Sequence, residues 1–389
     1  MRALIALALV VVPTWARADV SIGGSIGAGA QGAATYGALD LRLDAAWPDA
    51  RVRLGLGARG VWDDAVFRRS DWNSAGSIVT LVRDFAIARD VGDTQLALAA
   101  GGLAPAHVGK LVDGYRVALD DRFRTGVRVA AHREHLDVTA ELDDLLDPGL
   151  VAAGARYAMA PPYAMHLGLA IDPRAPSLRG AQTAAAIEVG ASRRFEAFRA
   201  RADVGVSVVA ELSLGASAVV FANGAIERAG VVWSARADVR AGTGTVGSTF
   251  GPLYRIERVA HDGRMSLWDR AEAGELDGAS AGLAVGAALA THSATHSGGL
   301  AGWLELGARA RPGLGGLAFA GAGAPMGKWV QAGMWAAVGR DDAAGAAELR
   351  VAWAKRLFSG LQLSRLYRFD AMEPTSLWSL TAWFGAATE

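Results

Sequence analysis

The sequence predicts an all-β protein, a single closed antiparallel β-barrel that crosses a membrane. Three observations predict this fold: an N-terminus typical of export, a hydrophobic chain without a spanning helix, and a two-residue alternation of apolar and polar side chains. The mean hydropathy is +0.22, yet beyond the N-terminus no window reaches the ~18 uncharged apolar residues that a membrane helix needs. A closed barrel is the structure that satisfies every backbone group in lipid without such a helix.

The first residues predict export. Arg2 supplies a positive charge, residues 3–12 are apolar, and residues 16–18 read Ala-Arg-Ala, a small-x-small cleavage pattern. Ten apolar residues are too few to cross a core of ~30 Å, which argues against a membrane anchor. We therefore expect residues 1–18 to be a signal peptide and residues 19–389 to form one outer-membrane barrel.

Apolar and polar residues alternate along most of the mature chain. In the segment Phe198–Val208 the even positions are apolar, whereas Arg199, Arg201 and Asp203 occupy the odd ones. Such alternation predicts strands with one apolar and one polar face. A secreted β-sandwich would show the same pattern, but segments of about 9–14 residues exceed the ~5–6 residues of soluble strands. The lengths favour the barrel.

Twenty segments are candidate strands. Because two neighbouring segments can prove to be one strand, or one segment two, we expect an even number of strands between about sixteen and twenty, centred on eighteen. The segments are 20–31, 37–47, 51–62, 77–90, 94–101, 126–132, 135–143, 150–158, 163–171, 182–192, 196–208, 213–222, 230–241, 278–290, 298–310, 314–323, 328–339, 346–357, 361–369 and 376–386.

Connections between these segments alternate in length. The long ones are 63–76, 102–125, 144–149, 172–181 and 242–277, and each follows an odd-numbered segment. The short ones are 48–50, 91–93, 159–162 and 193–195, each after an even-numbered segment. This alternation is typical of outer-membrane barrels, in which short turns face the periplasm and longer loops are extracellular.

Several stretches between Asp71 and Asp172 carry a family resemblance. They read DWNSAGSIVTLVRDFAIARD, GGLAPAHVGKLVDGYRVALDDRFRTGVRV and AELDDLLDPGLVAAGARY, and FGPLYRIERV follows at Phe250–Val259. Over about a third of its length, the chain resembles a family of uncharacterised, porin-like outer-membrane proteins of Gram-negative bacteria. The resemblance implies a barrel without a defined substrate. Porin families often end in an aromatic assembly signal, whereas here Phe384 is followed by Gly385–Glu389.

Three sets of residues are candidates for the site. Charged residues on the polar faces are expected to line the pore: Arg42, Asp44, Arg53, Arg59, Arg199, Arg201, Asp203, Arg236, Asp238, Arg240 and Glu348. The loop 102–126 either folds inward as a constriction or covers the barrel mouth; its charged and aromatic residues are Lys110, Asp113, Tyr115, Arg116, Asp120, Asp121, Arg122 and Arg124. An aromatic girdle at the membrane interfaces is expected from Trp47, Trp62, Trp233, Trp353 and Trp378.

Motifs for chemistry are weak, so no catalytic residue, metal or cofactor is expected. The pairs His132/His135 and His292/His296 have no third ligand at zinc spacing and fit polar turns better. Asp143 and Asp144 suit an exposed acidic turn better than a calcium site. The chain has no phosphate-binding G-x-x-x-x-G-K-[ST] motif.

The function predicted from these features is passive diffusion of small hydrophilic solutes or ions through an outer-membrane channel. Basic and acidic residues balance at 39 each, which argues against nucleic-acid binding. Expected partners are outer-membrane lipid and lipopolysaccharide, the barrel-assembly machinery and the solutes, and a homo-oligomer is left open. Two alternatives remain: a barrel enzyme acting on lipid, and a plugged structural or adhesive barrel.

Overall fold

The structure is a computed structural model of the 389-residue chain. It describes residues 19–31, 34–47, 51–69, 72, 79–103, 106–115, 124–177, 180, 182–197, 199–212, 214–244, 250–260, 263–289, 302–325, 330–354, 357–370 and 373–387. The expected signal peptide, residues 1–18, lies outside the described residues. Among the described residues no helix has the length and apolar character to cross a membrane.

The described residues form strands, most of them long, and two short helices. The strands are β1 (Asp19–Gln31), β2 (Ala34–Trp47), β3 (Val52–Asp63), β4 (Val66–Phe67), β5 (Val82–Val91), β6 (Thr94–Gly101), β7 (Ala106–Val108), β8 (Val112–Tyr115), β9 (Gly126–Arg133), β10 (Leu136–Leu142), β11 (Val151–Ala158), β12 (Tyr163–Ala175), β13 (Gln182–Ala197), β14 (Ala200–Glu211), β15 (Gly215–Arg228), β16 (Val231–Gly242), β17 (Gly278–Leu289), β18 (Trp303–Arg311), β19 (Gly315–Pro325), β20 (Val330–Val338), β21 (Ala343–Ala352), β22 (Leu357–Asp370) and β23 (Glu373–Ala387). The helices are α2 (Tyr254–Glu257) and α3 (Leu267–Glu272).

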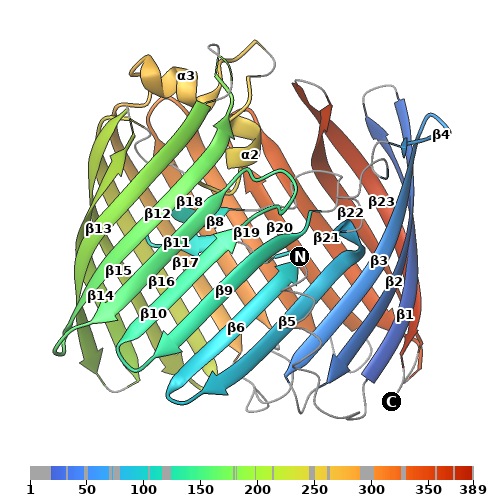
Figure 1. Ribbon diagram of the computed structural model, residues 1–389, viewed down its shortest axis with the longest axis horizontal. Coiled ribbons are helices and arrows are strands. Elements are labelled where there is room, and N and C mark those ends of the chain that lie inside the picture. The colour runs from blue at the N-terminus through green and yellow to red at the C-terminus, as the bar shows by residue number, and fades with distance from the viewer. Residues whose placement is uncertain are drawn as a thin grey trace.

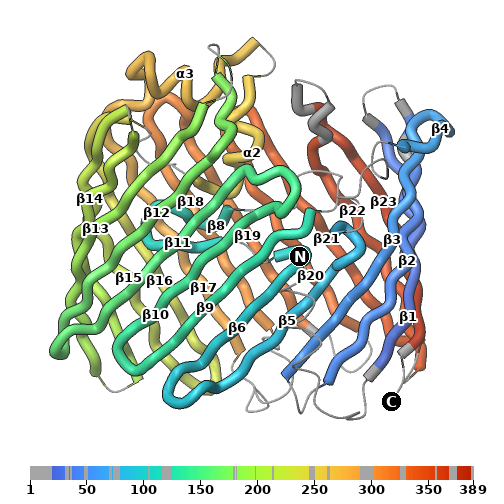
Figure 2. Tube along the Cα trace, viewed as in Figure 1, coloured from blue at the N-terminus to red at the C-terminus, as the bar shows by residue number. Residues whose placement is uncertain are grey.

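The sheet closes on itself (Figures 1 and 2). Each barrel strand pairs antiparallel with the next, and β1 pairs with β23 from Ser21 opposite Ala387 to Ala30 opposite Trp378. The described strands give a barrel of 20 with β4 as an extra strand beside β3, while β7 and β8 form a separate hairpin. The closed antiparallel barrel is therefore confirmed. The 20 strands lie at the upper limit of the expected range and not at its centre, eighteen. The central value is too low because each of the twenty candidate segments forms a strand of its own.

Side chains alternate between the two faces of the wall, as the sequence predicts. On β14 the exposed fraction is 57% for Val206 and 56% for Val208, whereas it is 2% for Ser207 between them. Exposed Leu, Val and Ile side chains cover the outer face of nearly every strand, and charged or small side chains face inward. Burial is thus inverted relative to a soluble protein, whose apolar residues lie inside.

The longest connections are concentrated at one end of the barrel, although short ones such as 312–314 and 339–342 also lie there. We call this end, where α2 and α3 lie, the loop end, and the opposite end, where β5 joins β6, the turn end (Figure 1). The long connections 64–81, 102–125, 143–150, 176–181 and 243–277 are all at the loop end. Two details differ from expectation: residues 193–195 continue β13 instead of forming a turn, and the connection 290–302, at the turn end, is long.

Two loop-end segments fold into the barrel. The hairpin β7–β8 and the stretch with α2 and α3 lie within the rim, where they pack on the inner faces of neighbouring strands (Figures 1 and 2). Leu111, Phe250, Tyr254 and Trp268 are fully buried there, together with small residues from β11 to β13. The largest hydrophobic core therefore sits inside the barrel and fills one side of its interior.

Candidate functional site

The hairpin β7–β8 is seated on the inner wall by close backbone approach. Gly109, at its tip, has a φ of +53°, and a Cβ there would overlap the Glu188 carboxylate of β13. The adjacent Lys110 N–H donates to Glu188 Oε2 at 2.5 Å. Val108 lies over Gly154 of β11, where a Cβ would come within 2.8 Å of its Cγ1. Glycine at both contacts lets the hairpin lie flat against the wall.

Asp113, on β8, joins the hairpin to the opposite strands. Its carboxylate lies 3.1 Å from Arg236 Nη1 of β16 and 3.4 Å from Arg309 Nη2 of β18, and His107 Nδ1 is 3.3 Å away. Burial alone would raise the pKa of Asp113, but the His107 hydrogen bond and the two guanidiniums hold that pKa well below its usual range. The carboxylate is therefore charged and fully engaged at neutral pH.

The wall behind the hairpin pairs its own acids as well. Arg309 donates to Asp238 with both terminal nitrogens, at 2.6 and 2.7 Å, and Arg240 Nε donates to the same carboxylate at 3.1 Å. Glu305 accepts from Arg236 at 2.6 Å. Bidentate guanidinium–carboxylate pairs are among the strongest polar contacts. The interior acids on β16 and β18 are thus occupied by protein donors.

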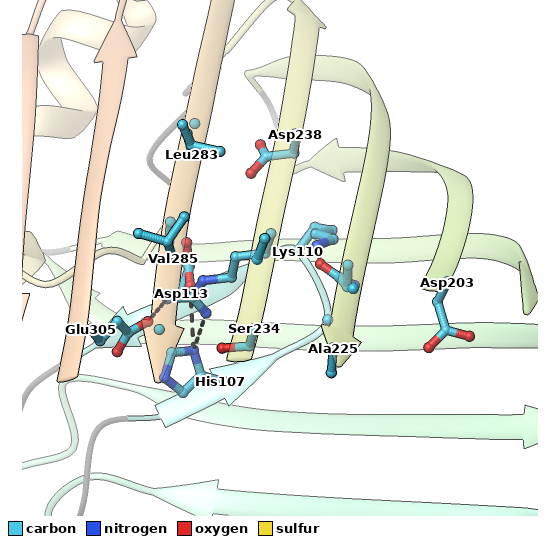
Figure 3. Close-up of a pocket in the computed structure, with 18 of the residues that line it drawn as sticks. His107, Lys110, Asp113, Asp203, Ala225, Ser234, Asp238, Leu283, Val285 and Glu305 are labelled. Carbon is cyan, nitrogen blue, oxygen red and sulfur yellow. Dashed lines mark hydrogen bonds and ion pairs between the residues drawn. The ribbon is translucent and has the colours of Figure 1, made fainter. Parts of the chain in front are cut away.

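A cavity of about 550 Å³ opens between the hairpin and strands β10 to β19. Figure 3 shows Lys110 and Asp113 projecting over the wall that carries Asp238 and Ser234. Seven Lys and Arg side chains line it against five Asp and Glu side chains. Lys110 Nζ donates to Asn223 Oδ1 at 3.3 Å and lies 4.4 Å from the ring centre of Phe221, and burial lowers the pKa of Lys110. Arg201 is exposed and has no ion pair among the described residues.

The cavity side chains that still have hydrogen-bonding groups to offer a solute are therefore mainly Lys and Arg. Arg156 adds to them in part, since its ion pair with Asp137 is long, at 3.8 Å. Such a surface offers hydrogen-bond donors to a passing solute and few acceptors. It also sets up a positive field on one side of the interior.

Two buried Tyr–Asp pairs lock the inward segments to the wall, one from the α2–α3 segment and one from the hairpin. Tyr254 donates to Asp172 at 2.7 Å, and Arg258 donates to the same oxygen at 2.6 Å. Tyr115, at the end of β8, donates to Asp143 at 2.5 Å. Burial and the neighbouring carboxylate raise the pKa of each tyrosine well above its ordinary value. Both phenols therefore stay protonated and act as donors at neutral pH.

This lock also connects the two inward segments directly. Asp113 N–H donates to the Phe250 carbonyl at 3.1 Å, and Phe250 N–H donates to the Leu111 carbonyl at 3.2 Å. The Trp268 indole donates to the Tyr254 hydroxyl at 3.1 Å. The hairpin and the α2–α3 segment therefore form one unit inside the barrel.

All of the expected pore residues except Arg199 lie on the inner face. Two of these, Arg240 and Asp44, are buried or paired there instead of being free to meet a solute. Arg199 is in the β13–β14 turn, with a φ of +58°, so it is not on a strand face. Arg240 is buried beneath the hairpin rather than exposed to the interior space. Asp44 is engaged by Arg42 at 2.7 Å. Those on the inner face are Arg42, Asp44, Arg53, Arg59, Arg201, Asp203, Arg236, Asp238, Arg240 and Glu348.

The expected constriction loop divides into three parts. Lys110 and Asp113 face the cavity. Tyr115 is fully buried and serves the lock instead of facing the cavity, and Arg124 pairs with Asp144 at 2.6 Å in the loop-end rim. Arg116, Asp120, Asp121 and Arg122 lie outside the described residues.

The expected girdle tryptophans are spread over both ends. Trp233, Trp353 and Trp378 are exposed on the outside, and Trp353 follows the last residue of β21. Trp62, near the loop end of β3, packs on Phe67 with ring centres 5.5 Å apart. Trp47 ends β2 at the turn end.

Several site residues were not singled out from the sequence. Glu188, Arg156 and Arg309 lie at inward positions of alternating strands, so the same alternation could have identified them. Tyr254, in α2, lies within a stretch expected to be an external loop. Its aromatic neighbours Phe250 and Trp268 were the signal that this stretch needs burial.

The structure gives little support for chemistry at these residues. The described residues contain no cluster of three or more His, Asp and Glu side chains that could hold a metal ion. Asp143 is buried and accepts from Gly149 and Leu150 N–H groups, so it is not the exposed acidic turn that was expected. His166 Nε2 lies 2.7 Å from Ser192 Oγ, but this pair faces the interior rather than lipid.

Comparisons with known proteins give likeness to solved structures alone. No family model and no curated protein matches the chain. OccK5 (OpdH) of Pseudomonas aeruginosa is 8% identical with a TM-score of 0.36, over 96% of this chain and 98% of that one. A BenF-like porin from Pseudomonas fluorescens Pf-5 is 10% identical with a TM-score of 0.36, over 95% and 98%. OccAB1 of Acinetobacter baumannii is 8% identical with a TM-score of 0.34, over 96% and 97%.

Proposed function

We propose that this protein is an outer-membrane channel through which small hydrophilic solutes and ions diffuse passively. One observation carries the proposal: charged side chains are exposed on the inside of a closed barrel whose outside is apolar. Arg53, Arg201, Glu348 and Arg350 are all exposed at inward positions. A soluble barrel would place its apolar face inside, so this arrangement suits lipid outside and water within.

The outer-face composition supports placement in a membrane. Leu41, Val206, Leu283 and Leu361 are exposed in the middle of their strands. An exposed apolar surface of this extent marks contact with a membrane or a partner. Removal of residues 1–18 as a signal peptide, assembly by the barrel machinery and contact with lipopolysaccharide belong to the same proposal. A homo-oligomer is compatible with it.

The filled side of the interior defines how solutes would pass. The hairpin lies against β11 to β18, and the α2 segment also reaches β19 to β21 at the loop end, where Leu253 and Ile256 pack on Leu317, Ala337 and Ala344. Solutes would pass beside these two segments, along the inner faces that they leave uncovered. Lys110 and Arg201 would face a solute from the cavity side. Fixed charges at such a narrowing select ions through their field.

Conductance across planar lipid bilayers tests the proposal. The mature barrel, folded in detergent and reconstituted, is expected to give discrete ion-conducting steps and to admit small sugars and amino acids in liposome-swelling assays. A folded barrel, shown by heat-modifiable migration in gels, that gives neither conductance nor swelling would support the plugged alternative. Turnover of lipid by that barrel, lost in Ser192→Ala, would instead support the enzyme alternative.

A further inference from the structure

The inner face opposite the cavity carries a different chemistry. Inward residues of β19 to β23 and β1 are glycine, alanine, serine, threonine, glutamine and aromatic side chains, with few charges. Two tryptophans lie on or beside it: Trp383 of β23, and Trp303, which is 36% exposed and belongs to the adjoining β18. This side of the lumen therefore offers rings and neutral hydrogen-bonding groups, whereas the cavity side offers cations.

The two indoles lie flat on glycines of neighbouring strands. A Cβ at Gly360 of β22 would overlap the Trp383 ring. A Cβ at Gly321 of β19 would come within 2.6 Å of Cζ3 of Trp303, and one at Gly323 within 2.6 Å of its Nε1. Each indole therefore packs closely on the backbone of a neighbouring strand, an arrangement that requires glycine beneath it. Both rings remain partly exposed.

Polar side chains occupy the inward row of residues next to the row that holds Trp383. Across β21, β22 and β23 the strand register places Glu348 opposite Gln362 and Gln362 opposite Thr381. The next inward row, two residues or ~7 Å along the strands, holds Arg350, Gly360 and Trp383. We call Glu348, Arg350, Gln362, Thr381 and Trp383 the Trp383 patch.

The two charged members of the Trp383 patch attract each other but form no close ion pair among the described residues. Glu348 and Arg350 are both exposed, and neither forms an ion pair with any side chain in the described ranges. The Arg350 guanidinium stacks instead on aromatic rings, 4.2 Å from the ring centre of Phe358 and 5.3 Å from that of Trp383. Stacking fixes the plane of the guanidinium and leaves its N–H groups at the edge for a ligand.

From this juxtaposition we propose that the Trp383 patch binds neutral sugar rings as they pass through the channel. An aromatic face takes up the apolar C–H face of a ring, while a carboxylate, an amide, a hydroxyl and a guanidinium at its border exchange hydrogen bonds with ring hydroxyls. Glu348 and Arg350 together add no net charge, and the carboxylate of Glu348 opposes an anionic ligand. The site thus recognises a neutral polyhydroxylated ring.

The second indole extends the site beyond one ring. Trp303 rests on β19 and Trp383 on β22, three strand spacings or ~14 Å apart, with Glu348 leaning over Gly333 between them. This separation exceeds one sugar ring, so a short linear oligosaccharide would contact both indoles. The assignment rests on the proposed channel function, because the lumen must be open for a sugar to reach the patch.

Binding and current block by maltotriose test the proposal on the mature barrel. Maltotriose binding is measured by calorimetry in detergent, and its block of ion current in planar bilayers; benzoate is the comparison ligand. We expect maltotriose to bind and to reduce the current, and Trp383→Ala to weaken binding about tenfold, the loss of one aromatic contact. Trp383→Phe, which keeps a ring, retains most of the binding.

Matched variants separate the site from a folding effect. Trp378→Ala removes a tryptophan from the outer face of the same strand and should bind maltotriose like the unchanged protein. Gln362→Leu removes the amide at similar size and leaves Trp383 in place, so weaker binding in this variant supports the site even when Trp383→Ala fails to fold. Every variant is first checked by heat-modifiable migration.

The outcomes distinguish this proposal from the channel itself. Ion conductance without maltotriose binding, or equal affinity in Trp383→Ala and the unchanged protein, overturns the sugar site and leaves the channel standing. Maltotriose binding to a barrel that does not conduct overturns the channel alone. Benzoate binding that depends on Trp383, in the absence of maltotriose binding, would assign the patch to aromatic anions instead.

Discussion

Pairing decides which charges of the barrel interior act on a solute. Asp113 and Asp238 each accept from more than one cation, so their fields are largely cancelled at short range. Arg201 has no such partner among the described residues and is exposed to the interior. At physiological salt a charge acts over ~8 Å. The ion preference of the proposed channel therefore follows the unpaired side chains rather than the even balance of the whole chain.

Reversal of one free charge should change ion preference. Arg201→Glu replaces a donor with an acceptor at the edge of the cavity, so the reversal potential in a salt gradient should shift toward cations while the barrel still assembles. Arg228→Glu, an exposed change beside the β15–β16 turn, is the control and should leave the reversal potential unchanged. An equal shift in both variants would show that net charge, and not the lumen position, sets the preference.

The tyrosine lock should open in alkali. The pKa of Tyr115 and that of Tyr254 lie above their ordinary value of 10.0 because of burial and a neighbouring carboxylate. A raised folded pKa means that the lock is at full strength below pH 10 and is lost as the pH rises further. We expect the α2–α3 segment to become sensitive to protease above pH 10, while the barrel strands stay protected.

Phenylalanine variants test the same lock at neutral pH. Tyr115→Phe and Tyr254→Phe each remove a donor from a buried carboxylate, which costs about 1–3 kcal/mol of local stability. Protease cleavage of the α2–α3 segment should then occur at pH 7, and the alkaline step should shrink. Tyr163→Phe, on the outer face, should change neither. Unchanged protection in both lock variants would show that apolar packing alone holds the segment.

At the scale of elements, the hairpin β7–β8 shows what alternation alone could and could not predict. The sequence left open whether the loop 102–126 folds inward or covers the barrel mouth; in the structure Leu111 and Val112 are buried against the inner wall. The seat on Glu188 and the pairing with Phe250 join residues far apart in sequence, so no local pattern could predict them. The short strands β4, β7 and β8 and both helices escaped prediction for the same reason, since they form where the barrel supports them.

Removal of the hairpin should widen the proposed pore. A short Gly–Ser linker in place of residues 106–115 removes the hairpin from one side of the lumen. Single-channel conductance should rise, because the pore becomes wider and loses the charges of Lys110 and Asp113 together. Asp113→Asn is the milder variant: it weakens three contacts to the wall, so conductance should fluctuate more without a large change in mean. A linker variant with the conductance of the unchanged protein would place the narrowest point elsewhere.

At the scale of the whole molecule, the positions of the strands and their faces follow from one periodic rule, although the expected central count was too low. Each of the twenty candidate segments has most of its residues in one barrel strand, since a strand that spans lipid must alternate along its full length. The register shift between β3 and β5 and the long connection after β17 are not readable from that rule. They depend on the register between neighbouring strands. The alternation of apolar and polar residues fixes this register only to within two residues, because a shift by two keeps every side chain on the same face.

The last prediction concerns the outer face and the membrane together. Val206, near the middle of β14, is exposed outward, so an arginine there would sit in the lipid core and cost about 2–4 kcal/mol. Val206→Arg should therefore lower the yield of heat-modifiable barrel in outer-membrane fractions, whereas Val206→Leu should not. Arg201→Ala, on the inner face of the same strand, should assemble like the unchanged protein because its side chain meets water.

Equal assembly of Val206→Arg and Val206→Leu would contradict a lipid-facing surface, since a valine exposed to water could be replaced by arginine at little cost. Reduced assembly of Arg201→Ala to the level of Val206→Arg would show instead that both faces of β14 are packed, which only a filled barrel allows.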